Sequence, residues 1–139
     1  MPPKFIAAVM LILLIVPNVL AQSITREHET VTPVFQHAIA NIPGKSLVSV
    51  VVNYAPGAKS ASHRHAPSAF IYAYVLSGEI RSQVGNEPAK VYKTGESFFE
   101  MPGAHHRLSE NASMTNAASL LAVIIVDSKE RHLTKPDLH

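Results

Sequence analysis

Apolar residues occur along this chain in short runs, separated by glycine, proline and polar residues. The runs are rich in valine, isoleucine, tyrosine and phenylalanine, which is typical of β-strands, and they show no helical period. The pattern predicts strands at residues 47–54, 70–76, 80–84, 89–92, 97–101 and 119–126. Many short strands at close spacing predict an all-β protein, built as an antiparallel sandwich or barrel.

Two of these strands differ in how their apolar residues are arranged. Residues 119–126 read SLLAVIIV, so we expect this strand to be buried on both faces. Residues 80–84 alternate apolar with polar side chains, as a half-exposed strand does.

The first 21 residues have the layout of a secretory signal peptide. A short positive start is followed by the apolar run FIAAVMLILLIV, and small residues at positions 19 and 21 precede a cleavage point before Gln22. The run is shorter than the roughly 20 residues that a membrane-spanning helix needs. We therefore expect an exported protein, periplasmic or secreted, with no membrane attachment after cleavage.

The rest of the chain is long enough for a single domain. We expect an N-terminal arm or edge strand at residues 22–40, a barrel at residues 41–128 and a polar C-terminal tail at residues 129–139. The chain has 12 basic and 10 acidic residues and no cysteine. The near balance of charge, without a basic stripe, argues against a nucleic-acid partner. The absence of cysteine excludes disulfides and thiolate chemistry.

One histidine pair suggests chemistry. His63 and His65 precede the apolar strand at 70–76, and residues two apart in a strand point to the same face. Two adjacent imidazoles repel each other when charged but can share a divalent cation when neutral. By itself the pair is a weak signal, because two surface histidines at a strand end would look the same.

Two motifs around this pair resemble those of the cupin family. The first is a glycine, a His-x-His pair and a closing glycine, here Gly57, His63, His65 and Gly78. The second is a glycine, a short strand, a proline-glycine turn, a histidine and an asparagine, here Gly95, Pro102, Gly103, His106 and Asn111. The resemblance covers residues 47–126. It implies a single-domain antiparallel double-stranded β-helix, the jelly-roll barrel of the cupins, often as a homodimer.

The resemblance also implies a metal inside the barrel, held by His63, His65 and His106. Three imidazoles suit several divalent transition metals (iron, manganese, nickel, copper or zinc), so the sequence leaves the metal open. His105 competes for the third position, but the spacing from Gly95 favours His106. Consecutive strand residues face opposite ways, which would make His105 a pocket or rim residue.

The sequence departs from the family pattern in two places. Met101 stands where the second motif has a proline, and Pro102 follows one residue late. The family has a glutamate ligand at the position of Ile71, and no acid stands between His65 and Gly78. Three neutral imidazoles alone would leave the metal its full charge and make it more Lewis acidic. Glu100, on the strand leading to the second motif, could supply the missing carboxylate as a fourth ligand or catalytic group, or could be a solvated strand residue.

The aromatic residues allow two interpretations. Tyr72 and Phe99 could line a substrate pocket together with His105, or they could pack the core, as aromatic side chains do in small barrels.

Three functions fit these observations. The first is a metal-dependent enzyme, similar to a dioxygenase, isomerase or lyase, acting on a small oxygenated molecule. The second is a non-catalytic periplasmic module that binds a small molecule or a metal. The third is a structural protein that a metal only stabilises. The sequence leaves the substrate and the reaction open.

Overall fold

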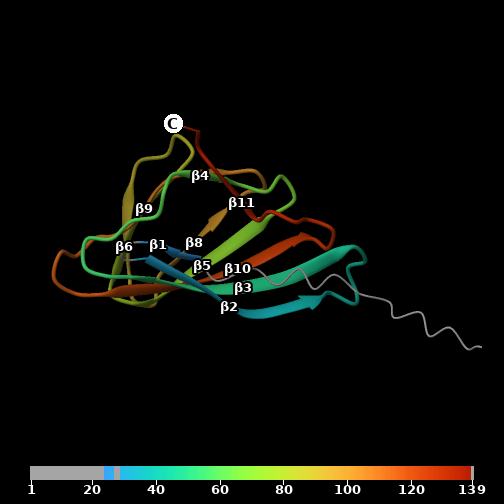
Figure 1. Cartoon of the computed structure of the whole chain (residues 1–139), viewed down its shortest axis with the longest axis horizontal. Coiled ribbons are helices and arrows are strands. Elements are labelled where there is room, and N and C mark those ends of the chain that lie inside the picture. Colours follow the sequence, from blue (N-terminus) through green and yellow to red (C-terminus); the bar gives the residue numbers. More distant parts are fainter. Residues whose placement is uncertain (1–23, 27–28, 139) are drawn as a thin grey trace, which may run out of the picture.

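The computed structural model describes residues 24–26 and 29–138, so the predicted signal peptide lies outside the described residues. The described chain folds into strands and turns, arranged as two antiparallel sheets that face each other (Figure 1). The predicted all-β fold, an antiparallel double-stranded β-helix, is confirmed. Within the described residues, no helix is long and apolar enough to cross a membrane.

The larger sheet has six strands in the order β1-β2-β3-β10-β5-β8. Their bounds are β1 Ile24–Arg26, β2 Glu29–Ala38, β3 Lys45–Tyr54, β10 Ala118–Asp127, β5 Phe70–Ser77 and β8 Ser97–Glu100. The segment 22–40, expected to be an arm or edge strand, thus contributes β1 at the edge of this sheet and β2 beside it.

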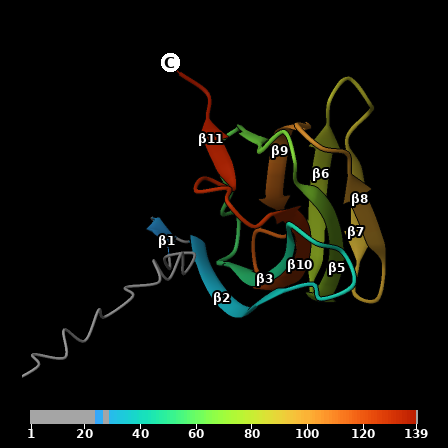
Figure 2. The ribbon, with the colours of Figure 1, turned by 90° about the vertical axis from the view of Figure 1, so that its right-hand side faces the viewer.

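The smaller sheet has five strands in the order β11-β4-β9-β6-β7 (Figure 2). Their bounds are β11 Thr134–Pro136, β4 His63–His65, β9 His105–Asn111, β6 Glu79–Val84 and β7 Lys90–Lys93. The six strands that the apolar pattern predicts correspond to β3, β5, β6, β7, β8 and β10. Strand β11 lies in the polar tail, where the pattern predicts no strand, and pairs with β4.

The core forms between the two sheets because inward and outward residues alternate along each strand. On β5, Ile71, Ala73 and Val75 are at most 2% exposed, whereas Phe70 and Tyr72 face outward. Inward residues gather in two clusters, one around Tyr54, Val75, Ile80, Phe98 and Leu120, the other around Val48, Val50, Ile71, Ile124 and Val126.

Strand β10 differs from its prediction in one respect. Its inward residues Leu120, Ile124 and Val126 are buried, but Leu121 and Val123 on the outer face are only partly buried. The expectation that both faces are buried is wrong for the isolated chain, because the described residues place no layer over the outer face of the six-stranded sheet.

The turn between β5 and β6 requires glycine. Gly78 has φ 71°, in the left-handed region that residues with a Cβ rarely adopt, and an added Cβ would lie 2.6 Å from the carbonyl oxygen of Ala117. The turn carries the chain from the six-stranded sheet to the five-stranded sheet. By comparison, Gly44 has φ 79° but no atom within 4 Å of an added Cβ.

We expect Gly78→Ala to lower the free energy of unfolding by about 3 kcal/mol, because backbone strain and a steric clash act together. The matched change Gly44→Ala should cost about 1 kcal/mol, since only the strain applies. Urea unfolding followed by circular dichroism measures both values. Equal losses in the two variants would show that the close contact at Ala117 does not constrain this turn.

Candidate metal centre

The candidate centre is built where β4 pairs with β9. In this antiparallel pair His63 lies directly opposite His106, and Arg64 lies opposite His105. His63 and His65 both point inward because they are two residues apart, while Arg64 between them is exposed. The register therefore brings residues 41 or more positions apart in sequence to one point inside the barrel.

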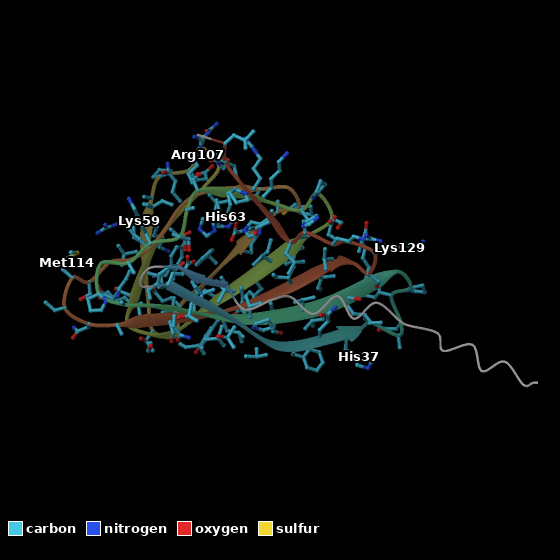
Figure 3. The ribbon with its side chains drawn as sticks, in the orientation of Figure 1. His37, Lys59, His63, Arg107, Met114 and Lys129 are labelled. Atoms are coloured by element: carbon cyan, nitrogen blue, oxygen red, sulfur yellow. The ribbon has the colours of Figure 1, made fainter. Side chains whose placement is uncertain are left out.

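The structure brings the three predicted histidines together. Ring nitrogens of His63, His65 and His106 lie within 4.8 Å of one another, a separation at which one ion can contact all three. The ring centres of His63 and His65 are 4.8 Å apart, and those of His63 and His106 are 5.3 Å apart. His106 is 5% exposed, and Figure 3 shows His63 in the interior of the fold.

Glu100 places a carboxylate at this group from β8, a strand of the opposite sheet. In the β5–β8 pair it lies directly opposite Ile71, the position at which the cupin motif has its glutamate. Directly paired residues share a face of the sheet, so Glu100 points into the barrel as Ile71 does. Glu100 is 2% exposed and is not a solvated strand residue.

The carboxylate lies against two of the three rings. Glu100 Oε2 is 3.0 Å from His65 Nε2, and Glu100 Oε1 is 3.2 Å from His106 Nδ1. Both nitrogens of His65 and Oε2 of Glu100 are nevertheless buried without a hydrogen-bond partner. Each buried polar atom left unpaired costs about 1–3 kcal/mol. A cation among these atoms would satisfy one nitrogen of His65 together with Oε2 of Glu100, so the residues fit a metal ion.

The protonation states also suit a cation. Burial lowers the pKa of His63 to about 4, so this imidazole is neutral at pH 7 and keeps a free lone pair. Burial by itself raises the pKa of Glu100, but its contacts with the imidazoles of His106 and His65 outweigh burial and lower that pKa to about 2. A neutral donor and an ionised carboxylate are the forms in which metal ligands bind.

Two further contacts orient the rings. The Nδ1–H of His63 donates to the carbonyl oxygen of Ala61 at 2.7 Å, which leaves Nε2 for a metal. Ser82 Oγ shares a hydrogen bond of 2.9 Å with His106 Nε2. Such contacts fix the orientation of ligand rings. Ser82 was not predicted from the sequence, where its only signal is a polar residue at an inward position between Ile80 and Val84.

His105 faces the opposite side of β9 from His106 and makes a different contact. Its Nε2 is 2.8 Å from Oδ2 of Asp137, and the hydroxyl of Ser62 donates to the same oxygen at 2.6 Å. Hydrogen bonds from Ser62 and, to a smaller extent, from His105 lower the pKa of the Asp137 carboxyl. His105 therefore ties the segment after β11 to the turn before β4, and it does not line the interior beside the three histidines. Asp137 carried no signal in the sequence.

Tyr72 and Phe99 do not line the interior either, which corrects both expectations for them. They pair with each other across β5 and β8, and they are 42% and 61% exposed on the outer face. Ile71 and Glu100 take the inward positions, and alternation sends the next residue of each strand outward.

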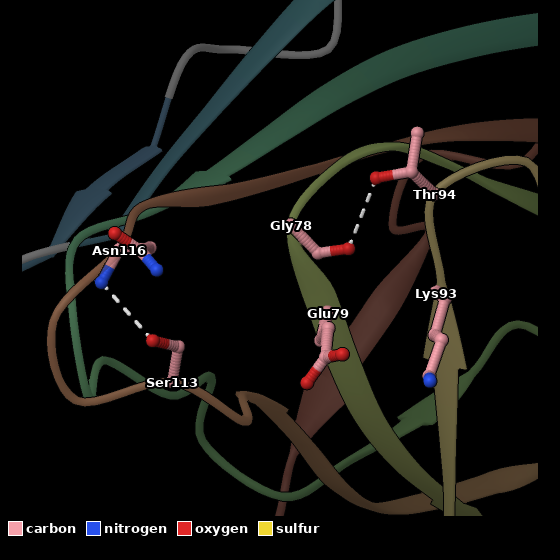
Figure 4. Close-up of a pocket in the computed structure, with 6 residues that line it drawn as sticks. All are labelled: Gly78, Glu79, Lys93, Thr94, Ser113 and Asn116. Atoms are coloured by element: carbon pink, nitrogen blue, oxygen red, sulfur yellow. Dashed lines mark hydrogen bonds between the residues drawn. The ribbon is translucent and has the colours of Figure 1, made fainter.

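The loop after β9 forms a separate, shallow pocket of about 380 Å³ (Figure 4). It is lined by Gly78, Glu79, Lys93, Thr94, Ser113 and Asn116. Glu79 begins β6, whereas Val84 at the other end of β6 pairs with His106, so about 17 Å of strand separates the pocket from the histidines. Asn111 supports this loop, since its side-chain amide donates to the carbonyl oxygens of Ala55 and Asn116.

Comparison with known proteins places this geometry in a known family. The family model described as "Cupin domain" matches residues 50–133, more than half of the chain. No protein of curated function has a significantly similar sequence.

Solved structures share the fold at low sequence identity. One is an oxalate oxidase in complex with the substrate analogue glycolate, with 23% identity and a TM-score of 0.57, covering 75% of this chain and 57% of that one. Another is the cupin domain of an XRE family transcriptional regulator from Enterobacter cloacae, with 18% identity, a TM-score of 0.57 and coverage of 70% and 96%. A third, of DMSP lyases, has 18% identity, a TM-score of 0.55 and coverage of 66% and 44%. This chain thus spans little more than half of the oxalate oxidase chain.

Without metal, the protein should lose stability as the pH falls from 6.5 towards 4. In this window the unfolded chain protonates His63 whereas the folded chain does not, so unfolding binds a proton. The loss should be on the order of 2–3 kcal/mol. Glu100, whose folded pKa of about 2 lies below the ordinary value of 4.5 for a glutamate, should add a further loss between pH 4.5 and 2.

Urea unfolding at a series of pH values, with a chelator present, measures this dependence. The variant His63→Gln should flatten the curve between pH 6.5 and 4, and His37→Gln, at an exposed position on β2, should leave it unchanged. A curve of the natural chain that is flat across this window would contradict the partly buried, neutral state of His63.

A divalent transition metal should raise the melting temperature of the natural chain, since it binds the folded form only. At a concentration one hundred times its Kd the gain is about 2.7 kcal/mol. His63→Ala should abolish the shift, and His37→Ala should retain it, because His37 extends from β2 on the opposite side of the fold (Figure 3). Thermal shift assays with manganese, iron, nickel, copper and zinc test this. The same shift in both variants would place the metal elsewhere.

Proposed function

The chain belongs to the cupin family, and on that premise we propose that it is a metal-dependent enzyme acting on a small oxygenated molecule. The observation that carries the proposal is the buried carboxylate of Glu100 against His65 and His106, with partnerless polar atoms on both sides of the contact. His63, His65, His106 and Glu100 would hold a divalent transition metal. The natural metal is not assigned, because this donor set suits several ions.

The donor set defines the charge that a substrate would meet. Three neutral imidazoles and one carboxylate reduce a divalent cation to a net charge of +1. Four protein ligands leave room on a metal that accepts five or six donors, as catalytic sites do. When bound, such a metal supplies a Lewis acid or a redox centre for the oxygen atoms of a substrate. A small anion with carboxylate or hydroxyl oxygens fits this site best.

The residues around the proposed metal have distinct roles. Glu100 is better suited to ligation than to general-base catalysis, because its pKa of about 2 makes it a weak proton acceptor near neutral pH. Ile71, the buried partner of Glu100 across the β5–β8 pair, shields the carboxylate from water. Ser82 and the carbonyl oxygen of Ala61 hold two of the rings in place.

The similar structures support an enzyme and also suggest the second candidate. The oxalate oxidase, solved with the substrate analogue glycolate, acts on a small carboxylate, which is the substrate class we propose here, and the DMSP lyases are enzymes too. The cupin domain of a transcriptional regulator has the same fold, so a non-catalytic module that binds a small molecule is the alternative. We also propose, from residues 1–21 alone, that the protein is exported.

Metal-loaded protein should turn over small carboxylates, tested first with oxalate and glycolate in an oxygen electrode and by product analysis. Glu100→Gln keeps the shape of the side chain but removes its charge, so turnover should fall about 10–100-fold. Glu87→Gln, at an exposed position, should have no effect. Saturable binding of these carboxylates without turnover would contradict the enzyme and favour the binding module.

A further inference from the structure

A second buried carboxylate lies inside the barrel, outside the set of candidate metal ligands. Glu29, on β2, is 5% exposed and lies directly opposite Tyr54 of β3, which is 2% exposed. The hydroxyl of Ser60 donates to Oε1 of Glu29. The three histidines and Glu100 do not contact this carboxylate in any printed bond of the metal centre, and a buried carboxylate is costly without partners.

Hydrogen bonds continue from Ser60 through two further hydroxyl groups. The Tyr54 hydroxyl is 2.6 Å from Oγ of Ser60 and 2.9 Å from Oγ of Ser109. Burial raises the pKa of Tyr54 to about 12, so this hydroxyl keeps its proton at neutral pH. The phenol therefore has one proton to donate and can accept further hydrogen bonds.

The row of hydroxyls reaches the candidate metal centre through Ser82. Ser109 of β9 pairs directly with Ser82 of β6, and both side chains are buried. Directly paired residues have Cβ atoms about 4.5–5.5 Å apart, so rotation of the two serine side chains can bring their hydroxyls within hydrogen-bond distance. Ser82 Oγ is 2.9 Å from Nε2 of His106. We call this series the hydroxyl chain; it consists of Ser60, Tyr54, Ser109 and Ser82.

The direction of each hydrogen bond follows from the number of protons available. Ser60 gives its single proton to the carboxylate, so Tyr54 must be the donor to Ser60. Tyr54 then has no proton left, so Ser109 must donate to Tyr54. By the same count, Ser82 donates to Ser109 and is left to accept a hydrogen bond from the Nε2–H of His106. The order of protons thus runs from His106 to the buried carboxylate.

A proton on Nε2 leaves Nδ1 of His106 as the nitrogen with a free lone pair. Nδ1 faces Glu100, at 3.2 Å from its Oε1. A neutral imidazole carries its proton on one nitrogen and binds a metal through the other. Without metal, the Glu100 carboxylate favours the proton on Nδ1. A cation at Nδ1 requires the proton on Nε2, where the hydroxyl chain accepts the hydrogen bond.

We propose that Glu29 is a remote positioning residue of the metal centre: through the hydroxyl chain it holds the proton of His106 on Nε2 and so favours metal binding at Nδ1. The usual partner of a ligand histidine is a carboxylate, carbonyl or water in direct contact with the ring. Here the carboxylate would act through four hydroxyl groups, from the six-stranded sheet to the five-stranded one. The inference rests on the metal site of the proposed function but requires no particular reaction.

Zinc affinity, measured at pH 7 by competition with a chelator, tests this coupling. Tyr54→Phe removes one hydroxyl and keeps the ring, so it should weaken zinc binding about tenfold, at the lower end for partners of ligand histidines. Glu29→Gln should have a similar effect, because an amide can donate as well as accept and no longer fixes the proton order. Ser46→Ala is the matched control, at a buried serine that bonds to Ser128 instead, and should leave the affinity unchanged.

A double-mutant cycle separates coupling through the hydroxyl chain from a packing effect. In the Ser82→Ala background the chain is already cut next to His106, so adding Tyr54→Phe should cost at most about twofold in zinc affinity. A packing effect of Tyr54 would instead add its full loss to that of Ser82→Ala. Circular dichroism and urea unfolding without zinc check that each variant folds. Ser109→Ala cuts the same chain at the next hydroxyl and takes the place of Tyr54→Phe if that variant does not fold.

The nitrogen-15 chemical shifts of His106 in the zinc-bound natural chain should show a protonated Nε2. Three results would overturn the inference: zinc bound at Nε2, unchanged zinc affinity in both Tyr54→Phe and Glu29→Gln, or additive losses in the cycle. Each of them leaves the metal centre and the proposed function standing. A natural chain that binds no zinc or other divalent transition metal would overturn the inference and the metal centre together.

Discussion

The contact of one buried carboxylate with two imidazoles organises the interior of this protein. Glu100 is nearly inaccessible to water, and an ionised carboxylate in such a place is costly unless other groups stabilise its charge. His65 and His106 meet it from two strands of the opposite sheet. The contact therefore joins β8 to β4 and β9 across the barrel, and it depends on both sheets being in register.

A cation would complete this arrangement. The two imidazoles offset only part of the free-energy cost of burying the Glu100 carboxylate, because His65 and Glu100 retain buried polar atoms without hydrogen-bond partners. A divalent ion would be a partner for one nitrogen of His65 and for the Glu100 carboxylate, and the ionised state of Glu100 and the neutral state of His63 are the states that it needs. The carboxylate comes from β8, whereas the family motif has it on β5 at the position of Ile71. Because the two positions are paired, the exchange keeps the carboxylate on the same face of the sheet.

The two faces of strands β5 and β8 have different roles. On β5 and β8, the residues that face inward build the core and the metal centre, and the residues that face outward, such as Tyr72 and Phe99, are exposed. Because consecutive residues of a strand face opposite sides of the sheet, a register shift of one residue would move Phe99 into the metal centre and Glu100 to the surface. A metal in the interior would stabilise this register.

The sequence by itself determined the fold class, six of the strands and the three histidines, because strand periodicity and motif spacing are local properties. It could not decide whether Glu100 faces in or out, since that depends on its pairing with Ile71. Nor could it decide that Tyr72 and Phe99 face outward or that Asp137 meets His105, because the two sheets and the return of the chain at β11 set these positions. Only the tertiary structure decides these orientations and contacts. Each depends on a residue far away along the chain, and no local sequence pattern encodes which residue that is.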